Sequence, residues 1–244
     1  YTLDDRLGFV VHDRNHAKGF IASTGTHMFT KENGEWKFTY GSERDADVCA
    51  ALYNLFFRAD GSYYGDFTNG DSDPTYDLLT KKFVSGEIFM ITAELDDSVS
   101  QLRDMTDDFG ILPYPKYDKT QESYTSSART THNSFLMPVT VNNPDAAGAV
   151  MEALSSSNYL TVSPTYFETA LKEKYSRDSD SARMYDIIKS GMTLDFGYAY
   201  SDILNWPDQI FQNSCKAENS FASNLAGRKD KCVAKLEEFI ETIQ

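Results

Sequence analysis

The chain has 244 residues, enough for one large domain or two small ones, and its 41% hydrophobic content is typical of a protein with a buried core. The net charge of −14 argues against a nucleic-acid partner and against adhesion to anionic lipid, because both attract basic surfaces. No apolar run reaches the length of about 18 residues that a membrane span needs. The cysteines Cys49, Cys215 and Cys232 are too few for a disulfide framework, so buried free thiols are expected, with a Cys215–Cys232 bridge as the alternative.

The first third of the chain predicts a strand, a hairpin and a helix. Residues 6–11 are a short apolar run and are expected to form a strand, while residues 31–41 form a hairpin whose two-residue turn is Asn33-Gly34. Apolar residues at helical spacing then predict a helix up to about residue 59. Residues 60–73 are polar and Gly-rich and are expected to form a loop.

The middle of the chain alternates between helix and strand. Asp73-Pro74 is a capping residue followed by proline at the first helical position, and it predicts a helix that ends before Gly86. The elements expected next are a strand at 87–95, a short helix from Asp96 or Asp97 to Met105, and strands at 109–112 and 133–139.

The second half is mainly helical. Asn143-Pro144 and Ser163-Pro164 repeat the cap-plus-proline signal, and the first of these helices carries an apolar face made of Ala147, Val150, Met151 and Leu154. Further helices are expected at 180–191, 201–215 and 229–243. Strands that alternate with helices across short connections predict an α/β fold, a mixed sheet flanked by helices.

The tripeptide Asp-Phe-Gly occurs twice, at 108–110 and 195–197, and it matches the magnesium-binding motif of protein kinases. A kinase also needs a Gly-rich loop, a strand lysine and a catalytic loop. The chain has no G-x-G-x-x-G and no A-P-E, and its His12-Asp13-Arg14 has the wrong order for a catalytic loop. Both copies are therefore interpreted as structural: Phe109 as a core side chain, and Asp108 at the turn that leads from a helix into a strand.

Three other candidate chemistries lack support. His12 and His16 have the spacing of a helical metal site, but the segment has no third ligand nearby, and a solvated loop is expected instead. No nucleophile motif of the G-x-S-x-G type is present. The many carboxylates neither support nor exclude a glycosidase, which needs two of them facing each other across a cleft. No metal, no cofactor and no catalytic residue is therefore assigned.

Aromatic rings beside polar loops are the remaining signal, since sugar-binding clefts stack apolar sugar faces on rings. The candidates are Trp36, Tyr63, Tyr64, Tyr124, Tyr159, Tyr166, Tyr198, Tyr200 and Trp206. Packing in the core is the alternative role for each of them. Trp206 is the most suggestive, because the following Pro207 marks a turn.

Residues 83–95 and 107–124 together resemble bacterial extracellular solute-binding proteins of family 1, the maltose-binding-protein-like capture proteins of ABC importers. The resemblance rests on a helix ending F-x-x-G, a strand with methionine, a short helix and a segment F-G-x-x-P-x-P. The matching residues are Phe83, Gly86, Met90, Phe109, Gly110, Pro113 and Pro115. It extends over nearly the whole chain and implies a lobe of the periplasmic-binding-protein type II kind.

Members of this family close two α/β lobes on a solute. The resemblance implies that residues 1–132 and 195–244 form the second lobe, and that residues 133–194 belong to the first lobe, most of which would lie in a longer protein. An apolar surface left uncovered by the missing part would favour aggregation or dimerisation.

The resemblance also implies where ligand contacts would lie: at the end of the strand, near Glu94, in the loop at Tyr124, and in the aromatic turn from Tyr200 to Trp206. Trp36 is added as a further ring. Family members that bind sugars often carry tryptophan where this chain has Glu94, a difference that argues against a maltose-type ligand.

The expected function is capture of a solute, a sugar or oligosaccharide, without covalent chemistry. The implied partners are the permease and ATPase of an ABC importer, and the implied location is extracellular, at a bacterial surface, with a lipid-anchored parent. A carbohydrate-active hydrolase and an interaction module without a small ligand are the alternatives.

Overall fold

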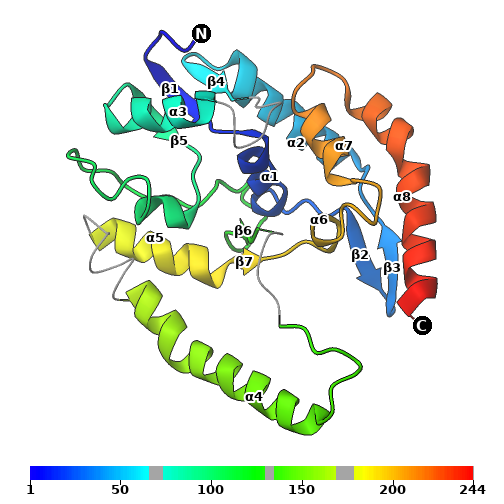
Figure 1. Ribbon diagram of the computed structural model, residues 1–244. Helices are drawn as coiled ribbons and strands as arrows, with labels where there is room; N and C mark the ends of the chain where they lie inside the picture. Colours follow the sequence, from blue (N-terminus) through cyan, green and yellow to red (C-terminus); the bar gives the residue numbers. More distant parts are fainter. Residues whose placement is uncertain (66–73, 130–134, 169–178, 244) are drawn as a thin grey trace.

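The structure is a computed structural model and describes residues 1–65, 74–129, 135–168 and 179–243. It confirms a mixed α/β fold with small parallel and antiparallel sheets flanked by helices (Figure 1). In chain order the helices and strands are β1 (Leu7–Val11), α1 (Arg14–Ser23), β2 (Phe29–Glu32), β3 (Glu35–Phe38), α2 (Glu43–Tyr53), a π-helix η1 (Asn54–Arg58), β4 (Ser62–Tyr64), α3 (Pro74–Val84), β5 (Ile88–Ile91), a 3₁₀ helix η3 (Leu95–Ser98), β6 (Ser126–Ser127), α4 (Pro144–Ser157), a π-helix η4 (Asn158–Val162), α5 (Ser179–Ser190), β7 (Met192–Thr193), α6 (Phe196–Ala199), α7 (Asp208–Ser214) and α8 (Phe221–Ile243).

The main sheet has three parallel strands in the order β4-β1-β5. Successive side chains of a strand point to opposite faces of the sheet, and both faces of the central strand β1 are covered. Val10 packs with Leu79 of α3 on one face, and Val11 packs with the main helical core on the other. A parallel strand covered on both faces is a continuous apolar run, as residues 7–11 are.

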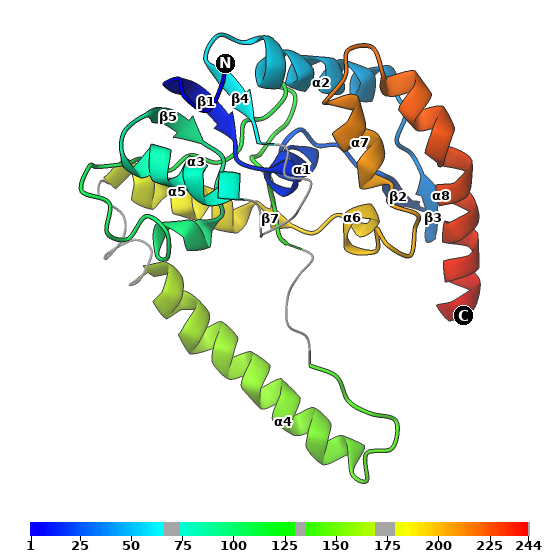
Figure 2. The ribbon, with the colours of Figure 1, turned by 45° about the horizontal axis from the view of Figure 1, so that its top comes forward.

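The main core lies between the sheet and four helices, α1, α2, α7 and α8 (Figure 2). Its largest fully buried side chains include Phe20 of α1, Phe56 of η1 and Phe211 of α7. The rings of Phe20 and Phe56 meet edge to face, with centroids 5.3 Å apart. Packing in this core holds α1 in place, and with it the carboxyl end of β1, after which α1 begins.

Several expected elements are confirmed, each for a local reason. The hairpin of β2 and β3 turns at Asn33 and Gly34, whose φ angles of 52° and 90° suit a tight two-residue turn. A capping box of Ser42 and Asp45 starts α2. Gly86, with a φ of 74°, follows the end of α3, whose expected capping residue Asp73 lies outside the described residues.

Some expected elements are wrong. Residues 60–73 are not wholly a loop, because Ser62–Tyr64 form β4 and pair with β1. Residues 109–112 form no strand, and the backbone of Ile111 bonds to the Ser181 hydroxyl at 3.2 Å rather than to a neighbouring strand. The helix expected to reach Met105 is the single 3₁₀ turn η3, which is started by reciprocal bonds between Glu94 and Asp97.

Several helices in the second half of the chain begin at residues other than the predicted ones. Helix α7 begins at Asp208, because residues 201–205 form turns, and α8 begins at Phe221 rather than at residue 229. Ser163 starts no new helix, because its own backbone is helical and continues the preceding turns. Of residues 133–139, the described part from 135 onward contains no strand.

Helix α4 and the residues around it form an arm that projects from the rest of the molecule (Figures 1 and 2). Asn143 caps α4 as expected, but no residue of α4 is buried, so its apolar face of Val150 and Leu154 is open to solvent. Helix α5, by contrast, packs on the body, where Tyr185 donates a hydrogen bond to Ser98 at 3.1 Å. The assignment of residues 133–194 to a first lobe stays a prediction.

The three cysteines are free and buried, as expected. No helix among the described residues is both long enough and apolar enough to cross a membrane.

Candidate functional site

The carboxyl ends of the three parallel strands meet at one edge of the sheet. His12 follows β1, Gly65 follows β4 and Thr92 follows β5. The Thr92 hydroxyl accepts a hydrogen bond from the His12 backbone at 2.9 Å, and a Cβ atom added to Gly65 would lie 2.2 Å from the His12 carbonyl oxygen. In open α/β sheets this edge is where ligands bind.

The segment from His12 to His16 is not the solvated loop that its composition suggests. Asp13 is the N-cap of α1, and its carboxylate accepts hydrogen bonds from the backbone of Asn15 at 2.7 Å and of His16 at 2.8 Å, and pairs with the His16 ring at 2.8 Å. Burial opposes ionisation of Asp13, but these hydrogen bonds outweigh it and hold its pKa at about 2. Both histidines are buried, because the turn from β1 into α1 lies under the rest of the site.

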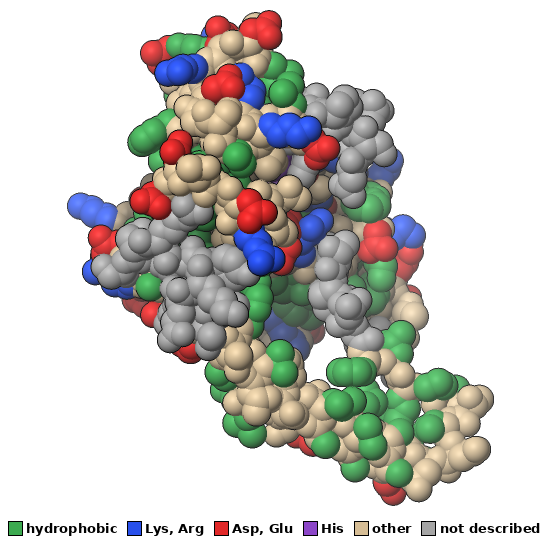
Figure 3. All heavy atoms as spheres, turned by 60° about the vertical axis from the view of Figure 1, so that its left-hand side comes forward, with side chains coloured by type: hydrophobic (Ala, Val, Ile, Leu, Met, Phe, Trp, Pro, Cys, Tyr) green, Lys and Arg blue, Asp and Glu red, His purple; other side chains and the backbone are tan. Residues whose placement is uncertain are grey.

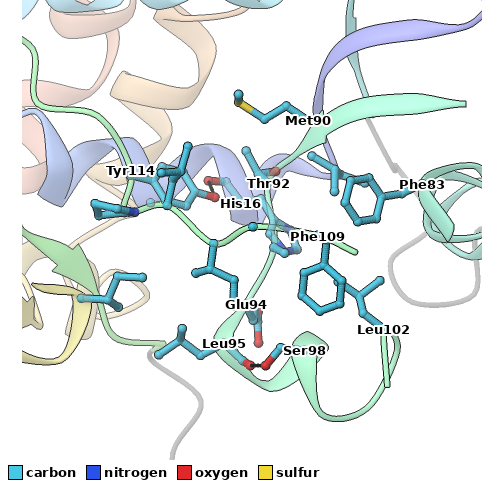
Figure 4. A pocket seen from close by; sticks show the side chains of 18 of the residues that line it. His16, Phe83, Met90, Thr92, Glu94, Leu95, Ser98, Leu102, Phe109 and Tyr114 are labelled. Atoms are coloured by element: carbon cyan, nitrogen blue, oxygen red, sulfur yellow. Dashed lines mark hydrogen bonds between the residues drawn. The ribbon is translucent and has the colours of Figure 1, made fainter. Parts of the chain in front are cut away.

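A pocket of about 1420 Å³ opens beside this edge, between β5 and residues 107–115 (Figure 4). It exceeds the range of about 300–1,000 Å³ that is usual for small-molecule sites. Its walls are largely apolar, with rings from Phe83, Phe89, Phe109 and Tyr114. Polar side chains lie at both ends of β5: Arg6, Glu87 and Asp107 near its amino end, and Glu94 and Arg129 beyond its carboxyl end.

Two residues singled out in the sequence as candidate ligand contacts line this pocket: the candidate ring Tyr198 and, beyond the carboxyl end of β5, Glu94. Its carboxylate pairs with Arg129 at 3.0 Å, and its backbone N–H donates to Asp97 at 2.7 Å. The side chains of Glu94 and Arg129 are both partly exposed, so each keeps capacity for a further hydrogen bond. Beside them, Tyr114 donates a hydrogen bond to the His16 carbonyl at 3.1 Å, and burial raises the pKa of this tyrosine. The arrangement can bind a polar group of a ligand while rings contact its apolar part.

The two Asp-Phe-Gly tripeptides lie in different parts of the structure. Phe109 is partly buried and lines the pocket, so its expected place in the core is wrong. Asp195 of the second copy caps α6 by accepting a hydrogen bond from the Tyr198 backbone at 3.0 Å. It also pairs with the His27 ring at 3.3 Å, and this hydrogen bond raises the pKa of His27 against the opposing effect of burial.

Trp36 and Tyr200 meet in one aromatic cluster rather than in the pocket. The Trp36 ring stacks on Phe196 with centroids 3.9 Å apart and an interplanar angle of 11°. Tyr200 contacts the same Phe196 at 5.2 Å and Phe239 of α8 at 5.1 Å. One face of the Trp36 ring is therefore occupied by packing.

Tyr124 and Trp206 lie in two further places. Tyr124 is 38% exposed, with the Lys116 ammonium 5.0 Å from the ring centre. Trp206 lies in the turn between α6 and α7, where Asn205 and Trp206 have φ angles of 62° and 58°. A left-handed backbone is strained for a large aromatic residue. Arg228 of α8 stabilises the turn by donating to the Asn205 carbonyl at 3.0 Å, and the Trp206 ring is 44% exposed.

Among the residues that line the pocket, His16, Tyr114 and Arg129 are ones to which sequence reasoning gave no ligand-binding role. For His16 the signal was present, since it follows a buried strand at the start of a helix. Nothing in the sequence around Arg129 indicates that it reaches Glu94, 35 positions away. Within the described residues, no group of three or more His, Cys, Asp or Glu side chains could hold a metal ion.

Comparisons of the chain with protein-family models, with curated proteins and with solved structures gave no match.

Proposed function

We propose that this chain is part of an extracellular solute-binding protein that captures a sugar or oligosaccharide for an ABC importer. In this proposal the β4-β1-β5 sheet and its helices belong to one lobe of a periplasmic-binding-protein type II fold. The arm around α4 belongs to the other lobe, which further sequence would complete. The ligand is bound by closure of the lobes, with no covalent chemistry, because it has a higher affinity for the closed state.

The observation that carries the proposal is the pocket at the carboxyl edge of the sheet with Glu94 in it. A capture protein needs a concave site that is open to solvent on one side and meets a second lobe there. The exposed apolar arm gives independent support, since a helix without a buried residue and with few charges is stable in water only against a partner.

The composition of the pocket supports a carbohydrate. The rings of Phe109 and Tyr114 line the pocket and can contact the apolar side of a sugar, while Glu94 and Arg129 offer one strong acceptor and several donors to its hydroxyls. The volume leaves room for more than one sugar unit. A polyanionic ligand fits the site poorly, because the protein carries a net charge of −14.

The test is ligand-dependent melting of a polypeptide that contains both lobes, against a panel of mono- and oligosaccharides, amino acids and short peptides. We expect at least one sugar to raise the melting temperature, because a ligand that binds only the folded state stabilises it. A shift with amino acids or peptides and none with sugars would refute the substrate class. The 244-residue chain alone should bind weakly or not at all, and micromolar binding by it would refute the two-lobe arrangement.

Two matched variants locate the site in the same assay. Glu94→Gln should reduce the shift that the sugar produces, because it replaces a charged acceptor that pairs with Arg129. Glu32→Gln is the control, since Glu32 also pairs with a cation, Lys37 at 3.2 Å, but lies in the β2–β3 hairpin. If both variants reduce the sugar-induced shift in melting temperature equally, Glu94 does not bind the sugar.

A further inference from the structure

Strand β5 is an edge of the main sheet, and its outer side is apolar and open. It pairs with β1 on one side only. Phe89 is 84% exposed and Met90 is 41% exposed. An uncovered apolar edge strand readily accepts another strand, because its outward N–H and C=O groups have no partner in the sheet.

The pocket runs along this edge for the full length of β5. Every residue from Gly86 to Asp96 lines it. Successive residues of a strand point to opposite faces, so an unbroken run can line one space only if that space lies beside the strand's edge. The opposite wall is again an unbroken run, residues 107–115, so this part of the pocket is a slot between two lengths of backbone (Figure 4).

The same chain exposes a segment of strand-like composition. Residues 135–139, Phe-Leu-Met-Pro-Val, carry no charge, and Leu136 is 88% exposed. Met137 precedes Pro138 and is therefore restricted to extended backbone. Figure 3 shows hydrophobic side chains gathered over the arm to which this segment belongs.

We propose that residues 135–139 of one copy of this chain pair with β5 of a second copy, and that the exchange is reciprocal. Each copy then fills the slot of the other, and the reciprocal exchange closes as a twofold dimer. The proline is compatible with this role. In a strand, alternate residues direct their N–H groups to the same side, so Phe135, Met137 and Val139 can face β5 while Pro138 faces away.

A second copy fits better than the segment's own molecule. The segment and α4 project away from the body, and their side chains are exposed there (Figures 1 and 2). Identical chains can exchange a projecting element without any further binding surface, since the slot and the segment are present in each copy. The inference concerns the 244-residue chain alone. Its slot includes Phe109 and Tyr114, which the proposed solute site also uses, so the exchanged segment and a solute would compete for this part of the pocket.

The decisive experiment is disulfide trapping between two variants that each carry one added cysteine, Phe89→Cys and Leu136→Cys. The native cysteines are buried and do not compete. Mixed under mild oxidation, the two variants should form a mixed dimer in at least about tenfold excess over a control mixture of Phe89→Cys with Val162→Cys, which places the thiol at another exposed position of the arm. Equal yields in the two mixtures would overturn the proposal.

A chain that carries both substitutions separates exchange from self-docking. Cross-linked dimers at micromolar concentration support the exchange, whereas a disulfide formed only within single chains would overturn it. Sedimentation velocity gives a second measure without oxidation. Phe89→Lys should raise the dimer dissociation constant about tenfold or more, because an edge lysine opposes strand addition, while Ile203→Lys on the body should not. A wild-type chain that stays monomeric up to hundreds of micromolar would refute the dimer.

Discussion

Replacing Asp13 tests how the candidate site is held at the end of β1. Asp13→Ala removes the acceptor for the backbone N–H groups of Asn15 and His16 and for the His16 ring. Loss of an N-cap side chain costs about 1–2 kcal/mol. Here Asp13 is 8% exposed, so water does not replace the lost bonds well.

The pKa gives an independent magnitude for the same contacts. A shift from the ordinary value of 3.8 to about 2 corresponds to about 2.5 kcal/mol, at about 1.36 kcal/mol per unit. The folded state binds this proton less readily than the unfolded state. The contribution is therefore complete above pH 4 and is lost as the pH falls from about 4 to about 2. Because the two magnitudes describe the same contacts, they are not added, and we expect Asp13→Ala to lower the free energy of unfolding by about 2–3 kcal/mol at pH 7.

Urea unfolding followed by circular dichroism measures this, at pH 7 and at intervals down to pH 2. Asp13→Asn keeps a capping side chain and removes the charge, so the difference in stability between wild type and this variant should shrink below pH 4. Asn143→Ala is the control: it removes the cap of α4, but no residue of α4 is buried, so the main transition should move by less than about 0.5 kcal/mol. If the difference in the free energy of unfolding between wild type and Asp13→Asn stays constant from pH 5 to pH 2, the reasoning is refuted.

Two further predictions concern packing and pH. Gly191→Ala should lower the free energy of unfolding by about 1–3 kcal/mol, because the new methyl would lie 2.2 Å from the Tyr124 carbonyl oxygen. Gly148→Ala, where nothing lies within 4 Å, should instead stabilise α4 or have no effect, and equal losses in thermal melting would contradict this. His27 has a raised pKa through Asp195, so its contribution is present below about pH 6.5 and is lost as the pH rises through the higher folded value. His27→Gln should reduce the change in the free energy of unfolding across this pH range by a few tenths of a kcal/mol. An unchanged pH dependence would exclude the His27–Asp195 pair as its source.

Local signals in the sequence determined most of the elements that are confirmed. Asn33-Gly34 fixes a hairpin because glycine and asparagine tolerate a positive φ, and Asn143-Pro144 fixes a helix start through one capping bond. The apolar run at residues 6–11 indicated a strand, which β1 confirms. Each of these depends on residues a few positions apart, so no knowledge of the rest of the chain was needed.

Pairings between distant segments could not be read in this way. Whether residues 109–112 become a strand depends on a neighbour to bond with, and here Ile111 bonds to the side chain of Ser181. Ser62–Tyr64 look like a loop and are a strand, because β1 supplies the partner. Both outcomes follow from the rule that buried backbone groups need partners, wherever those partners lie in the chain.

The candidate site divides in the same manner. The sequence by itself predicted a strand at residues 87–95 and a turn at Trp206. The strand is shorter than predicted, because β5 ends at Ile91, and Glu94 lies three residues beyond it. Only the tertiary structure decided that Glu94 meets Arg129 in a pocket, that Trp36 stacks on Phe196, and that Asp13 caps a helix among buried histidines. A residue's type and its near neighbours set its conformation, but its chemical environment is set by side chains that packing brings from elsewhere in the chain.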